Sequence, residues 1–191
     1  MKVVAFNGSA RRAGNTSLLI REVFTVLESE GIETELVELA GTSLPGCIAC
    51  YKCFEHQDQH CAVDDDRLNQ YLDLMIAADG IILASPTYFA DVSANLKALM
   101  ERAGMVAMAN NALFRRKVGA AVVTVRRGGA IHVFDSINHF FFIGQMIVPG
   151  SSYWNLGIGR EIGEVTADAE GMKTMTTLGQ NMSWLLKKIG S

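Results

Sequence analysis

The stretch that decides the fold is residues 3–20, VVAFNGSARRAGNTSLLI. It begins with four consecutive apolar residues, which is typical of a buried parallel strand. Gly8 and Gly14 interrupt this apolar run, and from Leu18 to Leu27 apolar residues recur at roughly helical spacing. The stretch therefore predicts a strand, a tight polar turn and the start of a helix.

The turn between this strand and helix is rich in groups that bind phosphate. Backbone N–H groups at a helix start have no partner within the helix, and the helix dipole adds positive potential there. Neither GxGxxG nor GxxxxGK[ST] occurs in the turn, so neither a dinucleotide fingerprint nor a P-loop ATPase is supported. We predict a phosphate-monoester site rather than an ordinary capped turn, because hydroxyl, amide and guanidinium groups gather there. These groups belong to Ser9, Arg11, Asn15, Thr16 and Ser17.

Length and charge limit the classes of protein to consider. A chain of 191 residues suits one domain with a sizeable core, so we expect a single domain over 1–191. The formal net charge is −3 and no basic block occurs, which gives no reason to expect nucleic acid or anionic membrane as a partner. No apolar run has the length of a membrane span, and the strand-like start at Met1 does not resemble a signal peptide. We expect a soluble, cytoplasmic protein.

Strand-like and helix-like segments alternate along the chain. Further strands are predicted at 34–39, 80–85, 118–125 and 146–149, and helices at 67–78, 93–109, 133–143 and 169–189. Five strands with interleaved helices indicate an α/β fold, an open and doubly wound parallel sheet covered on both faces. The flavodoxin-like strand order, 2-1-3-4-5, fits this pattern and places ligands at the carboxyl ends of the strands.

Three loops are predicted to meet at that edge of the sheet. They are the phosphate turn, the loop that begins with Pro86, Thr87, Tyr88 and Phe89, and the loop 126–129. Aromatic faces beside backbone amides suit a flat heteroaromatic ring. Phosphate and a flat ring together describe a mononucleotide cofactor.

The motifs GSARRAGNTS, ASPTYFADVSANLKALMER and TVRRGG resemble the NADPH-dependent FMN reductase family, which has a flavodoxin-like fold. The resemblance covers nearly the whole chain, including the tail SSYWNLGIGREIGEV, and it implies FMN bound without a covalent bond. It implies that the phosphate is held by Ser9, Arg11, Asn15, Thr16 and Ser17. The flavin ring would face Pro86, Thr87, Tyr88 and Phe89, with support from Thr124, Gly128 and Gly129.

The same resemblance implies hydride transfer from NAD(P)H to the flavin, with no side chain acting as acid or base. Late segments of some relatives shape the flavin pocket across a subunit interface. Phe140, Phe141 and Phe142 indicate core or a dimer interface, and we expect a homodimer or homotetramer.

All cysteines fall in a long segment at about 40–66, namely Cys47, Cys50, Cys53 and Cys61. Thiolates at this spacing can turn toward one metal centre. The spacing also resembles that of the iron–sulfur flavoprotein branch of the family, which implies a [4Fe–4S] cluster near the flavin. His56 and His60 leave a Cys/His zinc site open, and reduced thiols or a redox disulfide are further alternatives. Ala62 stands where ferredoxin-like runs usually have proline.

Three functions follow from these patterns. The first is an FMN-dependent NAD(P)H oxidoreductase whose acceptor is a flavin, a quinone, another small molecule or a protein. The second is an electron carrier that serves ferredoxin-like partners without nicotinamide chemistry. The third is a non-catalytic sensor based on the cysteine segment. The sequence does not distinguish NADH from NADPH.

Overall fold

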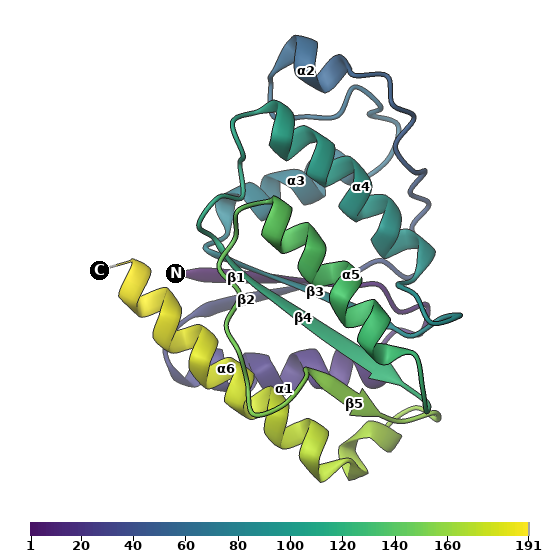
Figure 1. Ribbon diagram of the computed structural model, residues 1–191, viewed down its shortest axis with the longest axis vertical. Helices are drawn as coiled ribbons and strands as arrows, with labels where there is room; N and C mark the ends of the chain where they lie inside the picture. The colour runs from purple at the N-terminus through teal and green to yellow at the C-terminus, as the bar shows by residue number, and fades with distance from the viewer. Residues whose placement is uncertain (191) are drawn as a thin grey trace.

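The computed structural model describes residues 1–190 and contains one parallel sheet (Figure 1). Its strands lie in the order β2-β1-β3-β4-β5, and every neighbouring pair is parallel. The predicted flavodoxin-like order is therefore confirmed. The strands are β1 (Lys2–Asn7), β2 (Glu33–Glu38), β3 (Gly80–Pro86), β4 (Val118–Val125) and β5 (Leu156–Ile158).

Helices cover both faces of the sheet (Figure 1). One face carries α1 (Asn15–Ser29) and α6 (Ala169–Ile189), and the other carries α3 (Leu68–Ala77), α4 (Ala94–Ala109) and α5 (Ala130–Ile143). The short helix α2 (Lys52–His56) belongs to the cysteine segment, and a 3₁₀ turn, η1 (Glu164–Ala167), precedes α6. Among residues 1–190, no helix combines the length and the apolar character that crossing a bilayer requires.

The central strands are apolar throughout because they contribute to two cores. Val4 and Phe6 of β1 pack with α3, α4 and α5, whereas Val3 and Ala5 pack with α1 and α6. Successive side chains of a strand point to opposite faces, so a strand covered on both sides needs a continuous apolar run. This is the physical reason why the first strand could be recognised from sequence.

The prediction of the last strand is wrong. Residues 146–149 form no strand, and β5 lies later in the chain, at Leu156–Ile158. Ile147 makes only an isolated parallel bridge to Val118, at the beginning of β4. Pro149 has no N–H group to continue the pairing. The chain leaves the sheet there and returns to pair with the carboxyl end of β4.

Candidate functional site

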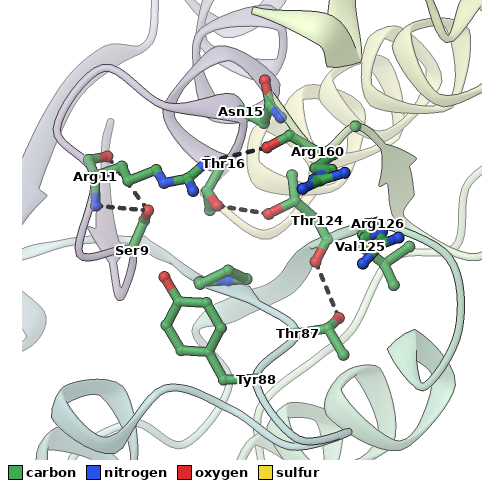
Figure 2. A pocket seen from close by; sticks show the side chains of 12 residues that line it. Ser9, Arg11, Asn15, Thr16, Thr87, Tyr88, Thr124, Val125, Arg126 and Arg160 are labelled. Atoms are coloured by element: carbon green, nitrogen blue, oxygen red, sulfur yellow. Dashed lines mark hydrogen bonds between the residues drawn. The ribbon is translucent and has the colours of Figure 1, made fainter. Parts of the chain in front are cut away.

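A pocket opens at the carboxyl ends of β1, β3 and β4, where the three predicted loops meet (Figure 2). We call it the edge pocket. It contains most of the residues that the resemblance assigned to FMN, and it also contains residues from a fourth segment of the chain. Its lining consists of Ser9, Arg11, Asn15, Thr16, Pro86, Thr87, Tyr88, Thr124, Val125, Arg126, Gly159 and Arg160.

Threonines join the three loops to one another. The hydroxyl oxygens of Thr16 and Thr124 lie 2.6 Å apart and are buried (Figure 2). Thr87 donates two hydrogen bonds to the carbonyl oxygen of Thr124, from its backbone N–H at 2.8 Å and from its hydroxyl at 2.9 Å. The start of α1, the end of β3 and the end of β4 are therefore held in fixed relative positions.

The phosphate turn is shaped by short side chains. The N–H of Ser9 donates to Oδ1 of the buried Asn7 at 3.0 Å, and the N–H of Arg11 donates to Oγ of Ser9 at 3.1 Å. Helix α1 begins at Asn15 with Gly14 as its N-cap, and no side chain among residues 1–190 caps it. Its first turn also has no acidic residue. The positive end of this helix therefore meets the pocket at Thr16 without an anionic partner from its own first turn.

The segment 159–165 closes the edge pocket beside the phosphate turn, and the sequence reasoning did not assign it a residue. The Arg11 guanidinium donates to the carbonyl oxygen of Arg160 at 3.0 Å. Glu164 accepts hydrogen bonds from the backbone N–H groups of Arg160 and Glu161, which lowers the pKa of the Glu164 carboxyl. The glycines in the tail SSYWNLGIGREIGEV were the available signal, since Gly159 lines the pocket.

Asn15 lines the pocket, but its amide bonds to this segment. Its Nδ2 donates to the carbonyl oxygen of Glu161 at 2.8 Å, and its Oδ1 accepts from the N–H groups of Gly163 and Val165. The side chain thus holds segment 159–165 in place. A direct phosphate contact from the Asn15 amide remains a prediction.

Four of the predicted cofactor residues lie outside the edge pocket. Ser17 is buried one residue further along α1. Gly128 and Gly129 line a separate cavity of about 270 Å³, whose wall also includes Ile158 and Asp168. Phe89 stands at the tip of a turn and is fully exposed.

The turn that carries Phe89 explains its position. Tyr88 and Asp91 exchange two backbone hydrogen bonds of 3.0 Å, which leaves Phe89 and Ala90 as the two central residues. Their φ values are +50° and +61°, in the left-handed region that side chains other than glycine rarely adopt. The tight turn therefore directs Phe89 into solvent while Tyr88 stays on the pocket wall.

Glu38 is the last residue of β2, and it contacts the residue that precedes the phosphate turn, Asn7. Asn7 donates from Nδ2 to the Glu38 carboxylate at 2.8 Å, and the same Asn7 orients Ser9. Burial raises the pKa of Glu38, and the Asn7 hydrogen bond together with the charges of Arg12 and Arg21 opposes this shift only in part. Glu38 therefore supports the turn through Asn7.

All cysteines line a second, smaller pocket, which we call the cysteine pocket. It lies against α4, where Arg102, Met105 and Val106 complete its wall. The cysteines are free thiols, of which Cys47 and Cys50 are exposed, Cys53 is buried and Cys61 is intermediate. Burial raises the pKa of the Cys53 thiol.

The donor set of the cysteine pocket has the number and kind of ligands that a [4Fe–4S] cluster takes. Four thiols around one pocket match the Cys₄ ligation of a [4Fe–4S] cluster, in which each iron takes its own thiolate. A single zinc ion needs ligands that converge on one point. Within the described residues, no three Cys, His, Asp or Glu side chains are grouped in that way.

The two pockets are separate in one chain. They share no lining residue among residues 1–190. Helix α4 connects their surroundings, because its first residue, Ala94, follows the loop of the edge pocket and Arg102 lines the cysteine pocket. Arg102 lies eight residues after Ala94, which corresponds to about 12 Å along the axis of α4.

Solved structures with a similar fold include flavin proteins. RosB with a bound 8-demethyl-8-formylriboflavin-5′-phosphate intermediate superimposes with a TM-score of 0.74, at 21% identity, over 100% of this chain and 80% of that one. A flavodoxin from the domain Archaea gives a TM-score of 0.63, at 16% identity, over 98% of this chain and 99% of that one. At these identities the likeness shows the flavodoxin-like fold.

Sequence comparison gives the family. An iron–sulfur flavoprotein of Methanocaldococcus jannaschii is 40% identical over 196 residues, which cover 99% of this chain and 99% of that protein. An iron–sulfur flavoprotein of Methanosarcina thermophila is 34% identical over 191 residues, which cover 99% of this chain and 97% of that protein. Residues 1–161 match the family model described as NADPH-dependent FMN reductase. The chain therefore belongs to the NADPH-dependent FMN reductase family.

Proposed function

We propose that the chain binds FMN without a covalent bond and uses it to pass electrons from NAD(P)H to an acceptor. The observation that carries this proposal is the edge pocket, in which a helix start without a side-chain cap adjoins an aromatic and hydroxyl-bearing loop. The relatives named iron–sulfur flavoproteins and the family membership support it.

The phosphate end of the pocket fits a dianion. The first turn of α1 offers backbone N–H groups and a positive dipole end, which favour a phosphate. Ser9 supplies a hydroxyl on the same wall, and Arg11 supplies a guanidinium. The bond from Arg11 to the carbonyl oxygen of Arg160 uses only one of its five donors. The others remain available for a bidentate phosphate contact.

The ring end of the pocket is open. The volume of the edge pocket is about 200 Å³, which is smaller than the roughly 300–1,000 Å³ of pockets that enclose a whole drug-sized ligand. We infer that the phosphate and ribityl chain lie inside, and that the isoalloxazine ring lies at the mouth beside Pro86, Thr87 and Tyr88. A ring held at the mouth keeps one face accessible to a nicotinamide.

Bound FMN would supply the ring that accepts a hydride from the nicotinamide. The residues of this chain orient that ring: Tyr88 offers an aromatic face, and the threonine links keep the three loops at fixed spacing. Arg126 and Arg160 line the mouth, where their charges would attract the phosphates of NAD(P)H. We assign no catalytic acid or base.

For the cysteine pocket we propose a [4Fe–4S] cluster held by Cys47, Cys50, Cys53 and Cys61. The supporting observation is that all these thiols line one pocket. Cys47 and Cys50 are exposed, so a cluster there would be accessible to a protein partner. This favours, as a second candidate function, an electron carrier that exchanges single electrons with ferredoxin-like proteins.

We also propose a cytoplasmic homo-oligomer. Phe140 and Phe141 are core residues, as the sequence suggested, but Phe142 is 61% exposed and adjoins the exposed Tyr153 and Trp154 in one groove. Large exposed apolar patches often mark protein interfaces. Light scattering on the purified protein measures the oligomeric state, and a monomeric mass would contradict this proposal.

Anaerobic purification followed by an ultraviolet–visible spectrum tests the proposed function. FMN, iron, zinc and acid-labile sulfide are quantified on the same sample, and the flavin absorbance is followed after NADPH or NADH is added. Rapid bleaching by a nicotinamide supports the oxidoreductase, and bleaching only by a ferredoxin supports the carrier. Protein that takes up no FMN even when FMN is supplied would refute the assignment of the edge pocket.

A further inference from the structure

Arg102 is the one charged residue that is buried among residues 1–190, and it lies on the wall of the cysteine pocket. It occupies the middle of α4 and is only 2% exposed. An apolar side chain of similar size could fill this position, since replacing a buried ion by well-packed apolar groups is often neutral or stabilising. The positive charge at this place therefore calls for an explanation.

The Arg102 guanidinium contacts both flanks of the cysteine segment. Nη1 forms an ion pair with the carboxylate of Asp66 and lies 3.5 Å from the carbonyl oxygen of Pro45. Nη2 donates to the carbonyl oxygen of Val63 at 2.8 Å and to the sulfur of Cys61 at 3.4 Å. The cation therefore fixes the segment to α4 and places an N–H group directly on a cysteine sulfur.

The backbone of Cys61 is held independently, by Asn69. The N–H of Cys61 donates to Oδ1 of Asn69 at 2.8 Å, and Nδ2 of Asn69 donates to the Cys61 carbonyl oxygen at 3.0 Å. Asn69 thus anchors the backbone of Cys61, whereas Arg102 places a positive charge beside its sulfur. This separation allows the two roles to be tested apart.

We propose that Arg102 is a positioning residue that raises the reduction potential of an iron–sulfur cluster bound through Cys61, an inference that rests on the cluster in the proposed function. One-electron reduction of a cluster adds one negative charge to the site and makes or breaks no bond. A fixed cation and an N–H···S hydrogen bond both stabilise the more negative form, and hydrogen bonds to the sulfurs are among the factors that set such potentials. Asp66 offsets part of this effect, because its carboxylate neutralises the same guanidinium.

Arg102 and Asp66 carry opposite charges, so we expect their substitutions to shift the midpoint potential in opposite directions. Arg102→Gln removes the cation, so we expect the midpoint potential of the cluster to fall. Asp66→Asn leaves the cation less compensated, so we expect the potential to rise. If the Arg102–Asp66 pair had a purely structural role, the midpoint potential would shift in the same direction in both variants or would not shift in either.

The experiment is a dithionite titration of full-length, anaerobically reconstituted protein, monitored by electron paramagnetic resonance, with iron and FMN quantified per chain. Asn69→Ala is the matched control, which we expect to lower iron content while the loaded fraction keeps the wild-type potential. FMN content should be unchanged in every variant. Equal potentials in wild type and Arg102→Gln, or shifts of the same sign in Arg102→Gln and Asp66→Asn, would overturn the proposal.

Two further outcomes are decisive. If Arg102→Gln does not fold or load iron, the test rests on Asp66→Asn. A midpoint potential of Asp66→Asn at or below that of the wild type then overturns the inference. If the wild-type chain assembles no cluster with iron and sulfide supplied, the inference fails together with the cluster. FMN binding and reduction by NAD(P)H are read from the flavin bands, so that part of the proposed function is judged separately.

Discussion

The hydroxyl oxygens of Thr16 and Thr124 lie 2.6 Å apart, although 108 positions separate the two residues in sequence. The pair joins the first turn of α1 to the end of β4 inside the edge pocket. Both residues are almost fully buried, with exposed fractions of 1% for Thr16 and 4% for Thr124. This single contact links the proposed phosphate end of the pocket to the strand that carries the third loop.

Replacement of both threonines should destabilise the fold by less than the sum of the two single replacements. Thr124→Val leaves the buried Thr16 hydroxyl without its partner, which costs about 1–3 kcal/mol of unfolding free energy. Thr16→Val should behave in the same way. The double variant should lose less than the sum of the two single losses, because no polar atom is left unpaired. Urea unfolding of the four proteins measures this, and strictly additive losses would show that the hydroxyls do not interact.

Arg11 and Arg12 provide a matched test of FMN binding. Arg11 lines the edge pocket, whereas Arg12 donates to the carbonyl oxygen of Ala40 and lies outside the lining. Arg11→Met should weaken FMN binding roughly 10- to 100-fold, because a hydrogen bond to a charged group contributes about 1.5–3 kcal/mol. Arg12→Met removes the same charge and should bind FMN nearly as the wild type does.

Quenching of flavin fluorescence during titration of the apoprotein measures both dissociation constants. An equal loss in the two variants would indicate that only the overall charge of the turn matters. Unchanged affinity in Arg11→Met would contradict a phosphate contact from this guanidinium.

The first strand, the turn and helix after it, and the sheet order could be predicted because their signals are local. A four-residue apolar run identifies β1. The polar residues that follow it include four that line the edge pocket, Ser9, Arg11, Asn15 and Thr16. The strand order then follows from general rules for parallel sheets. Contacts across the chain gave no such signal. Nothing near Asn15 in sequence indicates that its amide binds Gly163 and Val165.

Phe89 and the last strand show two other limits of sequence reasoning. Pro86, Thr87 and Tyr88 of the motif at 86–89 line the pocket, and their contact with a flavin stays a prediction. Residue type does not show that the backbone turns between Tyr88 and Asp91 and points Phe89 outward. Likewise, the apolar pattern at 146–149 is real, but only Ile147 pairs with β4, and the strand forms ten residues further on, at Leu156–Ile158.

Gly159→Ala should damage the edge pocket. A Cβ atom at this position would lie 2.7 Å from the backbone nitrogen of Val165 and 2.8 Å from Nδ2 of Asn15, so segment 159–165 would have to move. We expect a loss of about 1–3 kcal/mol in unfolding free energy, as for other overpacked sites, and weaker FMN binding. Gly150→Ala is the control, because a Cβ there meets no atom within 4 Å. If Gly159→Ala binds FMN as tightly as Gly150→Ala, segment 159–165 does not shape the site.

Glu38 should make the fold less stable as the pH rises. Burial raises the pKa of Glu38 above its ordinary value of 4.5, so between 4.5 and the raised value the folded state binds more protons than the unfolded state. The free energy of unfolding must then fall with increasing pH across that window and stay lowered above it. Glu38→Gln keeps an oxygen that accepts from Asn7 and has no charge to bury.

The difference in unfolding free energy between Glu38→Gln and the wild type should therefore grow in favour of the variant as the pH rises through this window, and level off above it. Denaturant unfolding at a series of pH values measures this difference. Glu55→Gln, at an exposed position of α2, is the control for removal of one charge. A difference that shrinks with rising pH would mean that the Asn7 hydrogen bond and the charges of Arg12 and Arg21 outweigh burial and hold the folded pKa of Glu38 below its ordinary value.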